Sequence, residues 1–178
     1  MENRNIQNPH PNPPPASDGG NNICGMSFKG STMREKIEHI KQTVTGWSGM
    51  TANPHRFGGL EFNLGSVEVG HIHHNGMVDI PFNSKIRTQL LAEKRAEPHH
   101  LLPETGWITF YIRSDADVEQ ALWLFRLSYL FYATRGSQKA ALKDVLDVPA
   151  EIEALHLSEA LRLVFDKVLG VHSEGEMQ

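Results

Sequence analysis

Residues 60–80 decide the fold, and they read Leu-Glu-Phe-Asn-Leu-Gly-Ser-Val-Glu-Val-Gly-His-Ile-His-His-Asn-Gly-Met-Val-Asp-Ile. Apolar and polar residues alternate on both sides of Gly65-Ser66, which is typical of two half-buried strands joined by a tight turn. Asn75-Gly76 is the strongest short hairpin signal, because a type I′ turn requires positive φ at both central residues. The stretch therefore predicts three consecutive antiparallel strands.

The length of the turn at Asn75-Gly76 decides which residues share a face with the histidines. A two-residue turn places His71 and His73 on the face of the apolar residues of the next strand, with Asp79 on the opposite face. A bulge at Gly76 shifts this register and brings Asp79 to the face of His71 and His73. The sequence leaves both registers open.

Helical patterns surround the predicted strands. Thr32 and Glu35 have the spacing of a capping box, and this helix is expected to end at Gly46. Further helices are predicted over Ser84–Arg95, after Ser114 and over Ser158–Leu169, and a fourth strand over Trp107–Ile112. This order predicts an α+β fold, in which helices cover an antiparallel sheet of about four strands and a helical extension follows at the C-terminus.

Length and composition predict one domain between two irregular ends. A chain of 178 residues suits a single domain. Residues 1–30 are rich in Asn, Pro and Gly, so we expect a disordered tail there. We expect one α+β domain over residues 31–172 and a flexible C-terminus over residues 173–178.

Several classes of protein are disfavoured by the composition. The net charge of -4 gives no electrostatic reason to expect nucleic acid as a partner. No apolar run approaches the ~20 residues that cross a bilayer, and no signal peptide is apparent, so no membrane association is expected. The single cysteine, Cys24, cannot form an internal disulfide. We expect a cytoplasmic protein, and the sequence gives no oligomeric state.

Six of the ten histidines fall between His55 and His100, so the chemistry is expected there. His71 and His73 leave the same face of a strand, because they are two residues apart. Such a pair can share a metal ion or bind a substrate oxyanion, with His99 or His100 as a third group. The same pair can also be ordinary strand packing.

Four blocks of the sequence resemble the fungal-luciferase-like domain family, over roughly residues 56–134. The blocks are Glu68–His73, Val78–Phe82, Ala96–His100 and Gly106–Tyr111. In the more remote fungal luciferases, His71 and His73 match an Ala-His-Met-His segment, and His99 and Trp107 match a histidine and a tryptophan. The chain departs from those enzymes at Asp79, where they have a histidine, and at Glu97-Pro98, where they have Gln-Arg.

The resemblance implies chemistry with molecular oxygen, because fungal luciferases oxidise a hydroxylated styrylpyrone with oxygen. Our first hypothesis is a cofactor-independent oxygenase that acts on a small enolic or phenolic substrate. His71 or His73 would be the base and His99 the partner of the substrate oxyanion. The expected substrate-binding residues are Asp79, His100 and Trp107.

Two other hypotheses remain open. The first is a metal-dependent enzyme, in which His71, His73 and His99 or His100 bind a divalent transition metal. The second is a non-catalytic domain that binds a small molecule or a partner, with the histidines in structural roles. In either enzyme, we expect His71, His73 and His99 to converge around an opening.

We expect Val78, Ile80 or Trp107 to line that opening, since they neighbour the histidines in the two-residue-turn register.

Deletion of residues 1–30 is predicted to leave the melting temperature nearly unchanged, because this segment has no periodic apolar pattern. Differential scanning calorimetry of the full and shortened chains measures the difference. A loss of several degrees would contradict the predicted tail.

Overall fold

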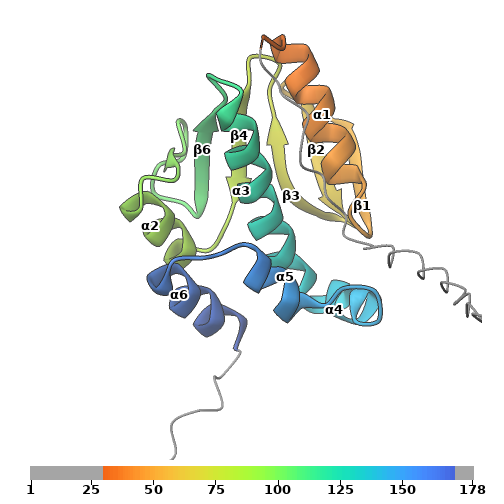
Figure 1. Ribbon diagram of the computed structural model, residues 1–178, viewed down its shortest axis with the longest axis vertical. Helices are drawn as coiled ribbons and strands as arrows, with labels where there is room; N and C mark the ends of the chain where they lie inside the picture. The colour runs from red at the N-terminus through yellow and green to blue at the C-terminus, as the bar shows by residue number, and fades with distance from the viewer. Residues whose placement is uncertain (1–29, 171–178) are drawn as a thin grey trace, which may run out of the picture.

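The computed structural model describes residues 30–170 and has an α+β architecture, which confirms the predicted class (Figure 1). One sheet of six strands packs against helices around a continuous cluster of buried apolar side chains. The predicted tail, apart from Gly30, and the predicted flexible C-terminus lie outside the described residues.

The sheet has six strands in the order β1-β2-β3-β4-β6-β5, and each neighbouring pair is antiparallel. The strands are β1 (Met50–Pro54), β2 (Leu60–Leu64), β3 (Val67–Ile72), β4 (Met77–Pro81), β5 (Glu97–Pro98) and β6 (Trp107–Tyr111). The prediction of about four strands missed β1 and β5, which form the two edges. β5 has only two residues, and β1 (Met-Thr-Ala-Asn-Pro) has one large apolar side chain and ends in proline, so neither carries a clear strand signal.

The helices are α1 (Met33–Thr45), α2 (Ser84–Ala92), α3 (Ala116–Ala133), α4 (Gly136–Leu142), α5 (Val148–Ala154) and α6 (Glu159–Leu169). The capping box of α1 is present, with Thr32 and Glu35 bonded reciprocally, and Gly46 ends the helix. The N-cap of α3 is Asp115 rather than Ser114. Ser114 instead donates its hydroxyl and backbone N–H to Asp117 in the first turn.

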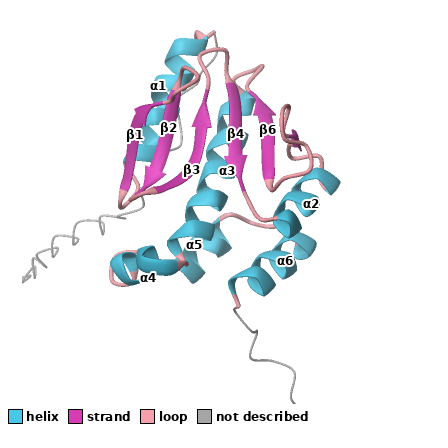
Figure 2. Cartoon of the chain, turned by 180° about the vertical axis from the view of Figure 1, so that it is seen from behind, coloured by secondary structure: helices cyan, strands magenta, loops and turns pink. Residues whose placement is uncertain are grey.

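Helices α1 and α3 lie on one face of the sheet, and among residues 30–170 the opposite face carries no helix (Figure 2). The core lies between α3 and the sheet, where Phe125 meets the ring of Phe62 edge-on at 5.0 Å. Gly70 allows this close packing, because a Cβ there would lie 3.0 Å from the Phe125 ring. Among residues 30–170, no helix combines the length and the apolar character needed to cross a membrane.

The hairpin between β3 and β4 uses the bulged register. His71 pairs with Asp79, and the loop over residues 74–76 closes between His73 and Met77. The two-residue turn is therefore wrong and the alternative with a bulge at Gly76 is confirmed. Asn75-Gly76 does not form a type I′ turn, because only Gly76 has positive φ, at 84°.

This register places the apolar side chains of β4 on the face of the sheet that packs against α1 and α3. The Asp79 carboxylate lies on the opposite face. Val78 and Ile80 are fully buried against the core. They do not line an opening beside the histidines, so the expectation is wrong for Val78 and Ile80, whereas the ring of Trp107 does lie beside His71. Asp79 instead lies with His71 and His73 on the helix-free face.

Phe125→Ala is predicted to cost about 3–5 kcal/mol in the free energy of unfolding, as for other large buried aromatic residues. Phe125 has no exposed surface and packs between α3 and the sheet. Chemical denaturation measures the loss. Phe57→Ala is the matched control, because Phe57 is 72% exposed and its removal should change stability by less than about 0.5 kcal/mol. Equal effects of the two variants would contradict this placement of the core.

Candidate functional site

Three adjacent strands place polar side chains in one row on the helix-free face. Asp79 on β4 pairs with His71 on β3 and with Thr109 on β6. Asp79 and Thr109 are fully buried, although they lie on the face that carries no helix. Asp79 is surrounded by His71 on β3, by His73 directly after it, and by the two histidines of the loop that follows β5.

Asp79 is the centre of this histidine cluster. Its Oδ1 accepts a hydrogen bond from the Thr109 hydroxyl and lies 3.7 Å from His99 Nε2 and from His100 Nδ1. Its Oδ2 lies 3.4 Å from the Nε2 atoms of both His71 and His73. Within the described part of the chain, Oδ2 has no hydrogen bond. The cluster therefore leaves one carboxylate oxygen open to a further partner.

The carboxyl group of Asp79 is ionised. Burial raises its pKa, but the hydrogen-bonding contacts with His71 and Thr109, together with the charge of His71, outweigh this and lower the pKa overall. A buried anion is stable only when cations or N–H donors compensate it. The surrounding imidazoles supply that compensation.

Both ring nitrogens of His71 face carboxylates. Nδ1 lies 2.6 Å from Glu68 Oε1, and Nε2 faces Asp79. Burial lowers the pKa of His71, but the contacts with Asp79 and Glu68 outweigh this and raise the pKa to about 9. With no other cation present, the ring is an imidazolium at neutral pH and has no lone pair that can accept a proton.

His73 lies beside the same carboxylate in a more open position. Its side chain is 17% exposed, against 9% for His71. Burial and the neighbouring charge of His71 lower the pKa of His73 and outweigh the attraction of Asp79. The ring is therefore neutral at neutral pH.

His99 is held in one orientation by the backbone of its own loop. Its Nδ1 accepts the N–H groups of Leu101 and Leu102, each at 3.1 Å. Burial foremost, together with the neighbouring histidines, lowers its pKa, so the ring is neutral. Because Nδ1 accepts, the ring hydrogen lies on Nε2, which points to Asp79. His99 thus presents a neutral N–H donor to the cluster.

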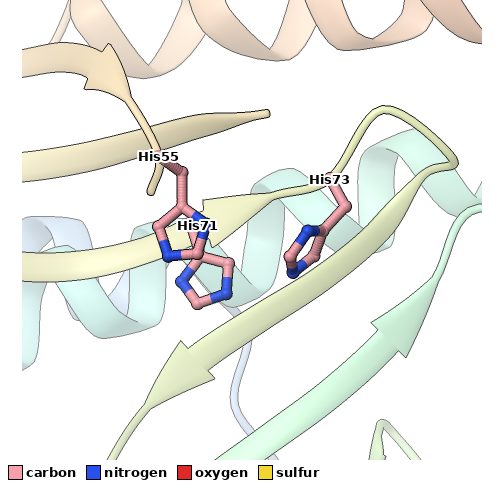
Figure 3. Close-up of side chains that lie close together, drawn as sticks. All are labelled: His55, His71 and His73. Atoms are coloured by element: carbon pink, nitrogen blue, oxygen red, sulfur yellow. The ribbon is translucent and has the colours of Figure 1, made fainter. Parts of the chain in front are cut away.

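His55 was not predicted as a site residue. It lies in the loop between β1 and β2, and its ring stacks on that of His71 with centroids 3.9 Å apart (Figure 3). Gly59 seats this loop against the end of β3, because a Cβ there would lie only 2.0 Å from the carbonyl oxygen of Ile72. The Gly58-Gly59 pair marked a loop, but nothing in the sequence joined His55 to His71.

The potential metal ligands fall into overlapping groups whose ligand atoms lie within 4.8 Å of one another. Among the described residues these groups are His55, His71 and His73; Asp79, His99 and His100; and His55, Glu61 and Glu68. The structure thus gathers all the expected site histidines around Asp79. It places His55, rather than His99, in a common group with His71 and His73.

Trp107 lies on β6 beside the cluster, with its ring 5.6 Å from His71 and 5.7 Å from His99. Two exposed apolar side chains lie on the adjoining loops, Phe57 at 72% and Leu101 at 74% exposure. A cavity of about 360 Å³ lies elsewhere, at the edge formed by β5 and β6, and no histidine lines it. The histidine cluster is therefore a largely buried polar site with exposed apolar side chains on the adjoining loops.

Comparison with known proteins gives one match. Residues 66–128 match the family model described as the luciferase domain. No curated protein and no solved structure matches the chain. The matched segment runs from β3 into α3 and contains Asp79 and every histidine around it except His55. The match confirms the resemblance that the four sequence blocks indicated: residues 66–128 of this chain are similar to a luciferase domain.

Proposed function

We propose that the histidine cluster around Asp79 is the active site of an oxygenase that acts on a small enolic or phenolic substrate. The observation that carries this proposal is the convergence of His71, His73 and His99 on a buried carboxylate with one open oxygen. The match to a luciferase domain supports molecular oxygen as the second substrate. The predicted cytoplasmic location is part of the proposal.

For this reaction the protein must supply a proton acceptor and a hydrogen-bond donor that stabilises the substrate oxyanion. An enol or phenol that loses its proton becomes electron-rich enough to reduce oxygen. The substrate then supplies two electrons, a carbon–oxygen bond forms, and the oxygen molecule becomes a substrate peroxide. Because the substrate itself supplies the electrons, this reaction can proceed without a cofactor.

His99 is suited to bind the substrate oxyanion. Its N–H is fixed before substrate arrives, because the loop backbone holds Nδ1. Preorganised donors stabilise developing charge without reorganisation during the reaction. A neutral imidazole serves in this role elsewhere in enzymology. Trp107 would form an apolar wall beside it.

His73 is the proton acceptor of the cofactor-free reaction. Of the two histidines predicted as bases, His71 has carboxylates at both ring nitrogens, whereas His73 is the more exposed. His100 lies next to the site, with its ring stacked on His99 and its Nδ1 3.4 Å from the Thr109 hydroxyl. It would contact substrate at the edge of the cluster.

Oxygen consumption with a panel of polyphenols and pyrones tests the proposal, with product masses to identify incorporated oxygen. His99→Asn is the decisive variant. The Asn amide oxygen can replace Nδ1 as acceptor for Leu101 and Leu102, while the Nε2 donor is lost. We expect kcat/KM to fall about 100-fold or more with the melting temperature nearly unchanged.

His156→Asn is the matched control and should retain full activity, because His156 is exposed and Asn tolerates its positive φ of 47°. Full activity in His99→Asn would contradict the assigned role. Binding of a panel compound without oxygen consumption would favour a non-catalytic binding domain instead.

A further inference from the structure

Two buried side-chain atoms in the cluster have no hydrogen bond within the described part of the chain. Among the described residues, three buried side-chain nitrogen or oxygen atoms have no hydrogen bond, and two of them are Asp79 Oδ2 and His55 Nδ1. Buried polar atoms are rarely left unsatisfied, because desolvation without a partner costs about 1–3 kcal/mol. Their concentration at one place indicates that a group is meant to bind there.

Two distances at Asp79 have the length expected between ligands of one metal ion. Oδ2 lies 3.4 Å from His71 Nε2 and 3.4 Å from His73 Nε2. Ligand atoms bound at about 2.1 Å to one ion lie roughly 3.0–3.4 Å apart in octahedral or tetrahedral geometry. We propose that His71 Nε2, His73 Nε2 and Asp79 Oδ2 bind one divalent transition-metal ion.

The neighbouring residues orient these ligands as a metal site requires. Glu68 Oε1 lies 2.6 Å from His71 Nδ1, so the carboxylate would hold the N–H of that nitrogen and leave Nε2 for the ion. The Thr109 hydroxyl binds Asp79 Oδ1 and leaves Oδ2 for the ion. His55 belongs to the same group of ligand atoms as His71 and His73 and is available as a fourth ligand.

The alternative set of Asp79, His99 and His100 is less suitable. His99 Nδ1 already accepts two backbone N–H groups, so Nε2 carries the hydrogen and has no lone pair for a metal. His99 is therefore a donor beside the ion rather than a ligand to it.

This ligand set deepens the proposed function, on which its catalytic part rests. Two histidines and one carboxylate with open positions are the ligands of non-haem iron(II) oxygenases, whereas zinc is not redox-active. Iron(II) is thus the cognate ion for an oxygenase. The ion, instead of His73, would favour the anionic form of the enol or phenol oxygen of a bound substrate. His99 would donate a hydrogen bond to that oxygen.

Metal binding by the full chain, purified without a histidine tag and freed of metal, tests the inference. Cobalt(II) titration followed by visible absorption, together with elemental analysis after loading with iron(II) or zinc, should show one ion per chain. His73→Ala should weaken binding by at least 10-fold, and Glu68→Gln by about 10–100-fold. His99→Asn and the control His156→Asn should bind as the unaltered chain does.

Failure of the unaltered chain to bind any of the three ions one to one would overturn the inference. So would binding that survives His73→Ala but is lost in His99→Asn. X-ray absorption of the zinc-loaded unaltered chain adds a measurement that no folding defect can disturb. We expect the spectrum to show two or three imidazole ligands at the zinc ion. A spectrum without imidazole ligands would refute the site.

Metal binding is measured without substrate, so its outcome is separate from that of the proposed function. Oxygen consumption that survives complete metal removal would overturn the catalytic role of the ion and leave the oxygenase proposal standing. If the chain binds one ion but consumes no oxygen with the panel, the metal site stands and the oxygenase proposal is overturned.

Discussion

The buried carboxylate of Asp79 is the constraint on which the site depends. Asp79 is fully buried and ionised between two strands of the sheet. Moving such a charge out of water costs several kcal/mol unless donors or cations surround it. Thr109 and four imidazoles do so from three separate segments. The imidazoles thus compensate the charge of Asp79, and the most chemically informative atom of the site is Oδ2, which lies near two of them but has no hydrogen bond among the described residues.

Loops rather than regular elements complete the site. His55 reaches the cluster because the glycine-containing loop after β1 folds back against the end of β3. His99 reaches it from the loop after β5, where two backbone N–H groups fix its ring. The sheet thus carries Asp79 and His71, and the segments that follow its strands add the other histidines, as in many binding sites. Where fungal luciferases have a histidine, this chain has Asp79, which supplies a carboxylate to the ligand set.

Much of the fold could be predicted because local patterns decided it. Alternation identified β2 and β3, and the capping box identified α1. The edge strands β1 and β5 could not be predicted, because pairing with a neighbour rather than their own composition makes them strands.

The sequence by itself determined the fold class, the pairing of His71 with His73 on one strand face, and the resemblance to luciferase-like domains. Only the tertiary structure decided that Asp79 joins them, because a one-residue difference in the hairpin loop moves every side chain of β4 to the other face. It alone brought His55 onto His71, since contacts across 16 residues leave no trace in local periodicity. It also set the tautomer of His99, because that depends on hydrogen bonds to a folded loop.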